Sequence, residues 1–301
     1  MKVVRFVRFF AVQWKKKQDG SVVLSSCIFM KGGGNMLDRI TLGDCLEKMR
    51  SIPSGSVDMI LTDLPYGTTA CRWDSIIPFE PLWREYERVI KPDGAVVLFA
   101  AQPFTTKLIE SNFRRFRYCW YWLKPYATGF TFAKSQPMRR VEDICVFYKR
   151  QPKYHPQGLR KLDEPIRRTK RKTADSVYKS STLSKPHEQR YTGYPRNVLE
   201  FPSDVSGGHG RLHPTQKPVA LCEYLIRTYT DPGDIVLDSC CGSGTTAAAC
   251  VRAFRHYIGI EMDAVYHARA VERVEKEAAE KQQRMEAMLQ TAADISELLK
   301  L

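Results

Sequence analysis

Two short stretches of this chain carry residue types that could do chemistry together. The first, Asp63-Leu64-Pro65-Tyr66, comes directly after the apolar run Val57–Thr62. The second, Asp238-Ser239-Cys240-Cys241-Gly242-Ser243-Gly244-Thr245-Thr246, begins where the apolar run Ile235–Asp238 ends. Both runs are predicted to be strands, and open α/β sheets bind ligands at the carboxyl ends of their strands. Both stretches are therefore expected at a ligand-binding edge.

The first stretch suits a planar amino group. Pro65 fixes its own φ and restricts Leu64, so the Leu64 carbonyl is held beside the Asp63 carboxylate. Tyr66 adds a flat ring for stacking. The exocyclic amine of a nucleobase has two N–H donors and a π face, and accepting both protons should draw its nitrogen towards a nucleophilic, tetrahedral state. These four residues alone also fit an ordinary strand-to-loop turn.

The second stretch predicts a nucleoside-bearing cofactor. Residues 242–247 fit G-x-G-x-x-G/A between a predicted strand and a predicted helix, which is the context that supports this motif. The glycines let the backbone approach a ligand, and the helix N-terminus offers unpaired N–H groups. Glu261 ends the next predicted strand, 23 residues after Asp238, where an acid can accept both ribose hydroxyls. The motif leaves NAD, FAD and S-adenosylmethionine open, as well as a glycine turn with no ligand.

Composition points to a polyanionic partner. The 301 residues carry a formal net charge of +14, which is typical of nucleic-acid-binding proteins and also occurs in basic proteins generally. Nine scattered cysteines contain no C-x-x-C pair, so no structural zinc site is predicted and a reducing cytoplasm is expected. The longest apolar run, Ala95–Ala101, is too short to span a bilayer. The segment Met1–Trp14 lacks the cleavage site of a signal peptide.

Strands and helices alternate along the chain, which predicts an α/β fold with a mostly parallel sheet covered on both faces. The expected strands are Val57–Thr62, Ala95–Ala100, Tyr118–Leu123, Asp143–Lys149, Ile235–Asp238 and His256–Glu261. The expected helices are Cys45–Ile52, Pro81–Ile90, Pro103–Ser111, Val219–Tyr229, Thr245–Ala253 and Ala264–Leu301. A turn is expected at Lys91-Pro92-Asp93-Gly94.

Five segments are predicted. Residues 1–35 form an extension or appended hairpin, residues 36–150 hold the first motif, and residues 210–263 hold the second. Residues 264–301 form a C-terminal helix, with packing on the domain favoured over dimerisation. Residues 151–209 form an insert: from 149 to 190 there are thirteen Lys/Arg and four Asp/Glu, a net of 13 − 4 = +9. Such a polar insert is expected to be functional or disordered.

With these motifs in this order, the chain resembles the amino-group DNA methyltransferases. Asp63–Tyr66 resembles their [D/N/S]-P-P-[Y/F/W] motif, and Asp238–Thr246 resembles their S-adenosylmethionine motif. The catalytic motif comes first, a variable region follows, and the cofactor motif comes last, which is the order of the circularly permuted β group. Other stretches also resemble motifs of that group: Leu42–Glu47, Trp122–Pro125, the stretch from Phe132-Ala133-Lys134 through Phe147-Tyr148, and the segment from His213 to Pro218. The similarity covers about residues 39–150 and 210–263.

The resemblance implies a Rossmann-like, S-adenosylmethionine-dependent methyltransferase fold with the insert as target-recognition region. The implied catalytic residues are Asp63, Leu64, Pro65 and Tyr66. The implied cofactor-binding residues are Asp44, Thr215, Gln216, Lys217, Asp238, Ser239, Cys240, Gly242, Ser243, Gly244, Thr245, Thr246 and Glu261, of which residues 215–217 would help hold the methionine end. The basic residues expected to contact DNA are Arg139, Arg140, Arg167, Arg168, Lys170, Arg171 and Lys172. No metal is implied.

The first residue of the catalytic motif indicates the base. In the family, Asp goes with N6 of adenine and Ser with N4 of cytosine, so Asp63 predicts an adenine turned out of duplex DNA. Methylation at C5 of cytosine would need a Pro-Cys pair, which the chain lacks. Cytosine N4, a protein glutamine or RNA substrate, and an inactive DNA-binding relative remain alternatives. The expected enzyme is cytoplasmic and prokaryotic or phage-encoded. Its expected partners are a second copy of the chain, forming a homodimer, and a cognate restriction endonuclease.

The chain departs from the family pattern at two places. Leu64 stands where a proline is usual, which predicts a slightly less rigid motif, although the backbone carbonyl remains. Ser239-Cys240 replaces a proline-aromatic pair after Asp238, so the contact that the family's aromatic residue makes with the cofactor is absent, which predicts lower affinity.

Overall fold

The computed structural model describes residues 14–16, 22–24, 36–67, 74–168, 187–202 and 216–298. It contains two compact units, Met1–Asn35 and Met36–Leu301. In the first unit, β1 (Trp14–Lys16) and β2 (Val22–Leu24) pair antiparallel. Within the described ranges, no helix is long and apolar enough to cross a membrane.

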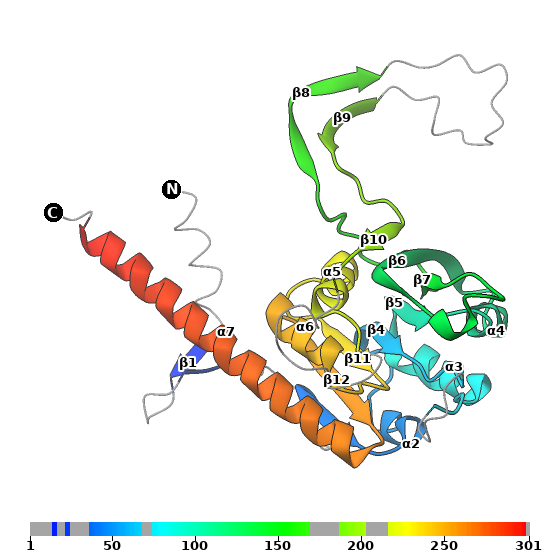
Figure 1. The fold of residues 1–301 in the computed structure, drawn as a ribbon. Coiled ribbons are helices and arrows are strands. Elements are labelled where there is room, and N and C mark those ends of the chain that lie inside the picture. Colours follow the sequence, from blue (N-terminus) through cyan, green and yellow to red (C-terminus); the bar gives the residue numbers. More distant parts are fainter. Residues whose placement is uncertain are drawn as a thin grey trace. The chain divides into compact units, whose positions relative to one another are not determined.

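The second unit is built on an eight-stranded sheet in the order β10-β6-β7-β5-β4-β11-β12-β3 (Figure 1). All neighbouring strands run parallel except the two pairs that include β7, which confirms the predicted mostly parallel sheet. The strands are β3 (Arg39–Leu42), β4 (Val57–Asp63), β5 (Ile90–Ala100), β6 (Phe116–Thr128), β7 (Arg139–Phe147), β10 (Val198–Glu200), β11 (Ile235–Asp238) and β12 (His256–Glu261).

Helices cover both faces of this sheet. One core cluster lies under α2, α3 and α4, and a second lies under α5 and α6, while α7 packs on α6 and β3. The helices are α2 (Cys45–Met49), α3 (Phe79–Val89), α4 (Phe104–Ser111), α5 (Val219–Tyr229), α6 (Thr245–Ala253) and α7 (Ala264–Leu298), with a 3-10 turn η1 (Phe130–Phe132). The predicted bounds of α5, α6, β11 and β12 are confirmed.

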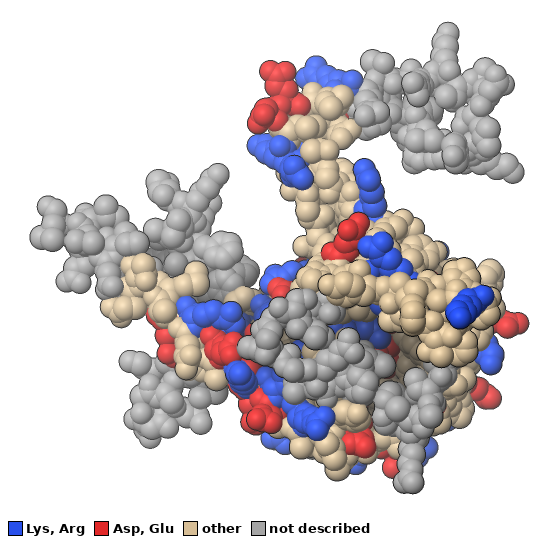
Figure 2. All heavy atoms as spheres, viewed as in Figure 1, with Lys and Arg blue, Asp and Glu red and all other residues tan. Residues whose placement is uncertain are grey.

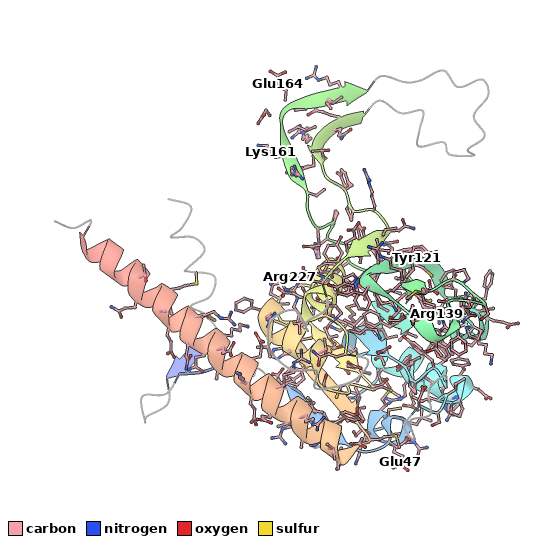
Figure 3. All side chains as sticks on the ribbon, viewed as in Figure 1. Glu47, Tyr121, Arg139, Lys161, Glu164 and Arg227 are labelled. Carbon is pink, nitrogen blue, oxygen red and sulfur yellow. The ribbon has the colours of Figure 1, made fainter. Side chains whose placement is uncertain are left out.

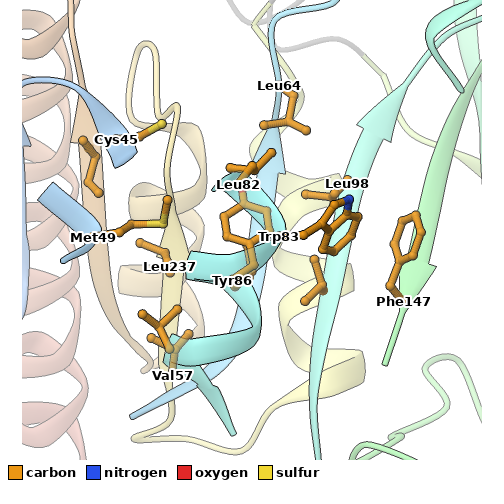
Figure 4. Packing of buried hydrophobic residues seen from close by; sticks show 14 of the residues in the cluster. Cys45, Met49, Val57, Leu64, Leu82, Trp83, Tyr86, Leu98, Phe147 and Leu237 are labelled. Atoms are coloured by element: carbon orange, nitrogen blue, oxygen red, sulfur yellow. The ribbon is translucent and has the colours of Figure 1, made fainter. Parts of the chain in front are cut away.

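Sequence patterns explain these layers. Strand β4 reads VDMILTD and is buried at five of its seven positions, as expected for a central strand covered on both faces. Helix α3 buries Leu82, Tyr86 and Val89, whose spacing places them on one face of a helix. Figure 4 shows Leu82 and Tyr86 packed among residues from the sheet and from α2.

The two motif-bearing strands lie side by side at the centre of the sheet. Val236 of β11 pairs with Met59 of β4, although the two residues are far apart in the sequence. Helix α3 leads from β4 to β5 on one side, and α6 leads from β11 to β12 on the other. The order of strands therefore reverses between β4 and β11, and ligands bind in the crevice at such a point.

Three predicted features differ from the structure. Lys91–Gly94 does not separate a helix from a strand: these residues lie within β5, where pairing jumps from Val57↔Ile90 to Met59↔Ala95. A Pro-Asp-Gly sequence can thus make an irregularity inside a strand as well as end it. Strands β6 and β7 also begin earlier than predicted, and β6 extends to Thr128.

The basic insert contains a hairpin that its composition did not reveal. Strands β8 (Arg160–Arg168) and β9 (His187–Thr192) pair antiparallel, and both signs of charge lie on them (Figures 2 and 3), including Lys161 and Glu164. Charged residues dominate β8, so no apolar alternation marks it as a strand. Its backbone pairing nevertheless supplies the ladder of hydrogen bonds that a strand requires.

Candidate active site

A cavity of about 600 Å³ opens at the carboxyl ends of β4 and β11. It contains most of the residues predicted from the two motifs. Its lining includes Asp44, Asp63, Leu64, Pro65, Tyr66, Gln216, Lys217, Asp238, Ser239, Cys240, Gly242, Ser243, Thr245, Thr246 and Glu261. Gly244 lies in the same turn, and Thr215 falls outside the described residues. The fold therefore brings both stretches to one cavity.

Asp63 is the centre of a network of charged side chains. Its Oδ2 atom lies 2.6 Å from Nζ of Lys217, and its Oδ1 atom accepts a 2.8 Å hydrogen bond from the Tyr66 hydroxyl. The Lys217 ammonium also lies 2.8 Å from Oε1 of Glu142 on β7. Lys217 was predicted near the methionine end of a cofactor, whereas the structure places it against the catalytic-motif acid.

Burial and neighbouring charges set the protonation of this network. Burial raises the pKa of Asp63, and the Lys217 ammonium acts in the opposite direction. Burial disfavours the Lys217 ammonium, but Asp63 and Glu142 outweigh that effect and raise its pKa. Burial, followed by the same two carboxylates, raises the pKa of Tyr66. Tyr66 therefore stays a neutral hydrogen-bond donor, and Lys217 stays a cation at neutral pH.

The ring of Tyr66 is fixed by a second aromatic side chain. Phe104, at the start of α4, stacks on it with 5.0 Å between ring centroids and 25° between ring planes. Phe104 is itself buried. One face of the Tyr66 ring is thus held by the core, in an orientation that is also set by its hydrogen bond to Asp63.

The structure explains how the chain accommodates its two departures from the family pattern. Leu64 is 3% exposed and packs in the core cluster (Figure 4), so its side chain anchors the motif where a proline would stiffen it. The Ser239 hydroxyl lies 2.6 Å from the hydroxyl of Tyr86, a buried residue of α3. Cys240 lines the cavity in place of an aromatic ring.

The glycine turn after β11 needs glycine at its end. Gly244 caps α6 with φ +76°, in the left-handed region, and a Cβ atom there would lie 3.1–3.3 Å from atoms of Ala270 on α7. Arg273 of α7 donates hydrogen bonds to the Ser243 carbonyl (3.2 Å) and the Thr245 hydroxyl (3.0 Å). The C-terminal helix thus packs against the predicted cofactor loop and holds its backbone.

The two acids predicted to bind a nucleoside also organise the backbone. Oε2 of Glu261 accepts a 2.8 Å hydrogen bond from the Gly242 N–H, and its Oε1 accepts one of 2.9 Å from the Asp263 N–H. Asp44 caps α2 by accepting a 3.1 Å bond from the Glu47 N–H. Each carboxylate oxygen has a further lone pair for a ligand hydroxyl.

Asp238 is buried at the end of β11, and burial raises its pKa to about 7. Between about pH 4 and pH 7 the folded chain therefore binds this proton more tightly than the unfolded chain. The contribution of Asp238 to the free energy of unfolding is complete below the unfolded pKa and is lost as the pH rises through 7.

We expect Asp238→Asn to remove this pH dependence. From pH 5 to pH 8, the stability of the wild type should fall relative to the variant by up to about 3 kcal/mol, because each pH unit below the folded pKa of about 7 corresponds to about 1.4 kcal/mol. Urea unfolding at four pH values measures the difference, with exposed Asp93→Asn as control. Parallel curves for wild type and Asp238→Asn would show that Asp238 does not titrate in this range.

The predicted DNA-binding residues lie outside the cavity lining. Arg139 and Arg140 are exposed at the start of β7, and Arg167 is exposed on β8, 4.0 Å from Glu188. Arg168 ends β8, and its side chain is not described. Lys170, Arg171 and Lys172 fall outside the described residues. The fold therefore places Arg139 and Arg140, but not Arg167, on strands that contribute to the cavity wall.

Four residues that support the site were not predicted from the sequence: Phe104, Glu142, Tyr86 and Arg273. They come from α4, β7, α3 and α7, and each reaches the motifs through tertiary contacts. An acid inside a strand that is otherwise mostly buried, as at Glu142, is the one signal that could have indicated a polar partner across the cavity.

Comparisons with known proteins agree with this geometry. The family model described as DNA methylase (N6_N4_Mtase) matches residues 57–272. Type II methyltransferase M.HpaI of Haemophilus parainfluenzae is 29% identical over 256 residues, covering 80% of this chain and 76% of the relative. DNA adenine methyltransferase YhdJ of Escherichia coli is 31% identical over 248 residues, covering 77% of this chain and 81% of the relative.

Solved structures show the same fold. The M1.HpyAVI–SAM complex matches with a TM-score of 0.52 and 23% identity, over 78% of this chain and 98% of that one. PvuII DNA methyltransferase, cytosine-N4-specific, matches with a TM-score of 0.58 and 19% identity, over 80% and 91%. Family model, relatives and fold agree, and we conclude that this chain belongs to the N6/N4 family of DNA methylases.

Proposed function

We propose that this protein transfers a methyl group from S-adenosylmethionine to N6 of an adenine turned out of duplex DNA. The observation that carries the proposal is the placement of Asp63, the Leu64 carbonyl and Tyr66 in one cavity with the glycine turn after β11. The names of M.HpaI and of the Escherichia coli adenine methyltransferase support the reaction class, and the M1.HpyAVI–SAM complex supports the cofactor.

The residues around the glycine turn fit S-adenosylmethionine. Gly244 leaves little room for a Cβ atom at the start of α6, and the N-terminus of a helix is a general site for polar and anionic ligand groups. Glu261 ends the next strand, and an acid at the end of this strand can accept hydrogen bonds from ribose hydroxyls. Asp238 is a buried carboxyl group, which a nearby cation would ionise. When bound, the cofactor supplies an electrophilic methyl group on a sulfonium. This methyl group is already reactive, so the protein needs mainly to position it.

On the other side of the cavity, the chain holds the amine. Asp63 and the Leu64 carbonyl accept the two N6 protons, and the base stacks on the face of Tyr66 opposite Phe104. Lys217 keeps Asp63 in place and favours its ionised form. Asp63 therefore acts as an oriented acceptor, and most of the rate is expected to come from this orientation.

Adenine N6 is favoured over cytosine N4 by Asp63, because the family pattern pairs Asp with adenine. Both bases present an exocyclic amine with two protons, so the network around Asp63 is chemically suited to either. The relative specific for cytosine N4 shares only the fold with this chain, at 19% identity. The base must therefore be established by product analysis.

The test uses radiolabelled S-adenosylmethionine, unmethylated duplex DNA of several sequences, and digestion to nucleosides. We expect label in N6-methyladenine. Label in N4-methylcytosine would keep the fold and reaction class but overturn the base. Absence of label on every DNA, with cofactor binding intact, would indicate a DNA-binding protein without activity.

The proposed setting is the cytoplasm of a bacterium, in line with the two bacterial relatives. The proposal includes two partners: a second copy of the chain and a cognate restriction endonuclease. Gel filtration of the full chain tests the first, and restriction of unmethylated DNA in the source cell tests the second.

A further inference from the structure

A loop at the mouth of the cavity presents an unusual set of side chains. This rim loop, residues 129–138, joins β6 to β7. Its stem borders the cavity through Pro125, Tyr126 and Thr128 on the β6 side. On the β7 side, Arg139 is the first residue of the strand and pairs with Thr128, and Figure 3 labels Arg139. The rim loop therefore begins and ends beside the opening through which a base would enter.

The rim loop exposes aromatic rings. Phe130 is 81% exposed and Phe132 is 56% exposed, and both belong to the 3-10 turn η1. Tyr126, on the stem, is 80% exposed. Large apolar side chains that gather on one exposed segment mark a binding surface, because water contact with them is unfavourable.

The backbone of the rim loop is held by its own hydrogen bonds. The Phe132 N–H donates to the Gly129 carbonyl at 3.0 Å, and the Gln136 N–H donates to the Phe132 carbonyl at 3.0 Å. Gly129 turns the chain with φ +93°, a conformation suited to glycine. The two phenylalanines are therefore presented on a preformed turn, which lowers the entropy lost when the turn binds a partner.

The charge around these rings identifies the partner. The chain carries no acidic residue from Lys124 to Val141, and in that stretch it has Lys124, Lys134, Arg139 and Arg140. Lys134, Arg139 and Arg140 are exposed. Cations beside exposed aromatic rings match a nucleic acid, because the cations can pair with its phosphates and the rings can stack on its bases.

We propose that the rim loop inserts Phe130 and Phe132 into the DNA, where they fill the space left in the base stack by the extruded base. The inference rests on the proposed function. Extrusion costs the stacking of the target base, and apolar wedges such as phenylalanine commonly enter opened base steps. Because the rim loop borders the cavity, one movement of the duplex would place the base in the cavity and the rings in the gap.

The test compares Phe130→Ala, Phe132→Ala and the double variant with the wild type, after the methylated sequence has been mapped. Phe113→Ala is the matched control, because Phe113 is 73% exposed but lies on the connection between α4 and β6. One readout is the fluorescence of 2-aminopurine placed at the target position, which rises when the base leaves the stack. The other is kcat/KM on a paired duplex and on a duplex with a mismatched target.

We expect the double variant to lose roughly tenfold to a hundredfold in kcat/KM on the paired duplex, the scale of one to two stacking contacts. Its fluorescence signal should fall in parallel. On the mismatched duplex the loss should be much smaller, because an unpaired base is extruded more easily. Phe130→Leu should recover much of the activity, since leucine also serves as a wedge.

Three outcomes would overturn the inference. These are equal losses on both duplexes, unchanged fluorescence, or a change of oligomeric state in Phe130→Ala, which would assign the rings to contacts between copies of the chain. The proposed function is tested separately, because a wild type that methylates no DNA would contradict it before any variant is made. If the wild type methylates adenine and the Phe130 and Phe132 variants behave like Phe113→Ala, the proposed function stands and only the wedge proposal is overturned.

Discussion

Replacing Asp63 with alanine is expected to abolish methylation of DNA while leaving the affinity for S-adenosylmethionine nearly unchanged. The variant loses the carboxylate that accepts an amine proton and orients Tyr66 through a 2.8 Å hydrogen bond. Loss of one preorganised hydrogen-bonding group in an active site typically costs roughly a hundredfold to a thousandfold in rate. The glycine turn and Glu261, which would hold the cofactor, are untouched. Label transfer and calorimetric titration of the cofactor measure the two quantities.

The matched control is Asp93→Ala, which removes an exposed acid near the opposite end of the neighbouring strand β5. It should behave as the wild type in both measurements. Normal turnover by Asp63→Ala would show that the amine is held by other groups. A parallel loss of cofactor binding would instead assign Asp63 to the cofactor half of the cavity.

Replacing Lys217 with methionine should have the second largest effect, and it should act on stability as well as rate. Lys217 is 7% exposed and lies between Asp63 and Glu142. Without the ammonium, two carboxylates remain close together and poorly solvated, and breaking such a pair typically costs about 3–5 kcal/mol. Urea unfolding measures this loss. The pKa of Asp63 should also rise, so residual methylation should shift to higher pH.

A double-mutant cycle separates the network from simple loss of packing. Glu142→Gln neutralises the second carboxylate with little change of shape, and in combination with Lys217→Met it removes one of the two carboxylates that have lost Lys217 as a partner. We expect the double variant to be more stable than Lys217→Met alone, because the two changes are coupled. Additive losses in the cycle would mean that Lys217 matters for packing and not for charge balance.

The central elements could be predicted because their signals are local. The run Ile235–Asp238, the glycine turn and the helix Thr245–Ala253 each carry strong patterns, and their predicted bounds are confirmed. The location of both motifs at one cavity also follows, since parallel strands present their carboxyl ends at the same edge.

The rest of the site depends on contacts that no local pattern contains. The predicted strand begins at Asp143, so it leaves out Glu142. In the structure Glu142 belongs to β7, and its pairing with β6 places it beside Lys217. Phe104 looks like any core residue of a helix, and its role emerges only from its stacking on Tyr66. Strand β3 is short, with an exposed end at Leu42, and it lacks a periodic signal.

The adjacency of β4 and β11 has a consequence for how the chain is made. Ser239 donates a hydrogen bond to Thr62, 177 residues earlier. On a ribosome that adds about 5–20 residues each second, β4 therefore waits roughly 10–30 s for its neighbour. During that interval a strand that is mostly buried in the finished fold has an unpaired edge, which is the kind of segment that aggregates or engages chaperones. Slow synthesis or low temperature is thus expected to affect the yield of soluble protein more than the stability of the finished fold.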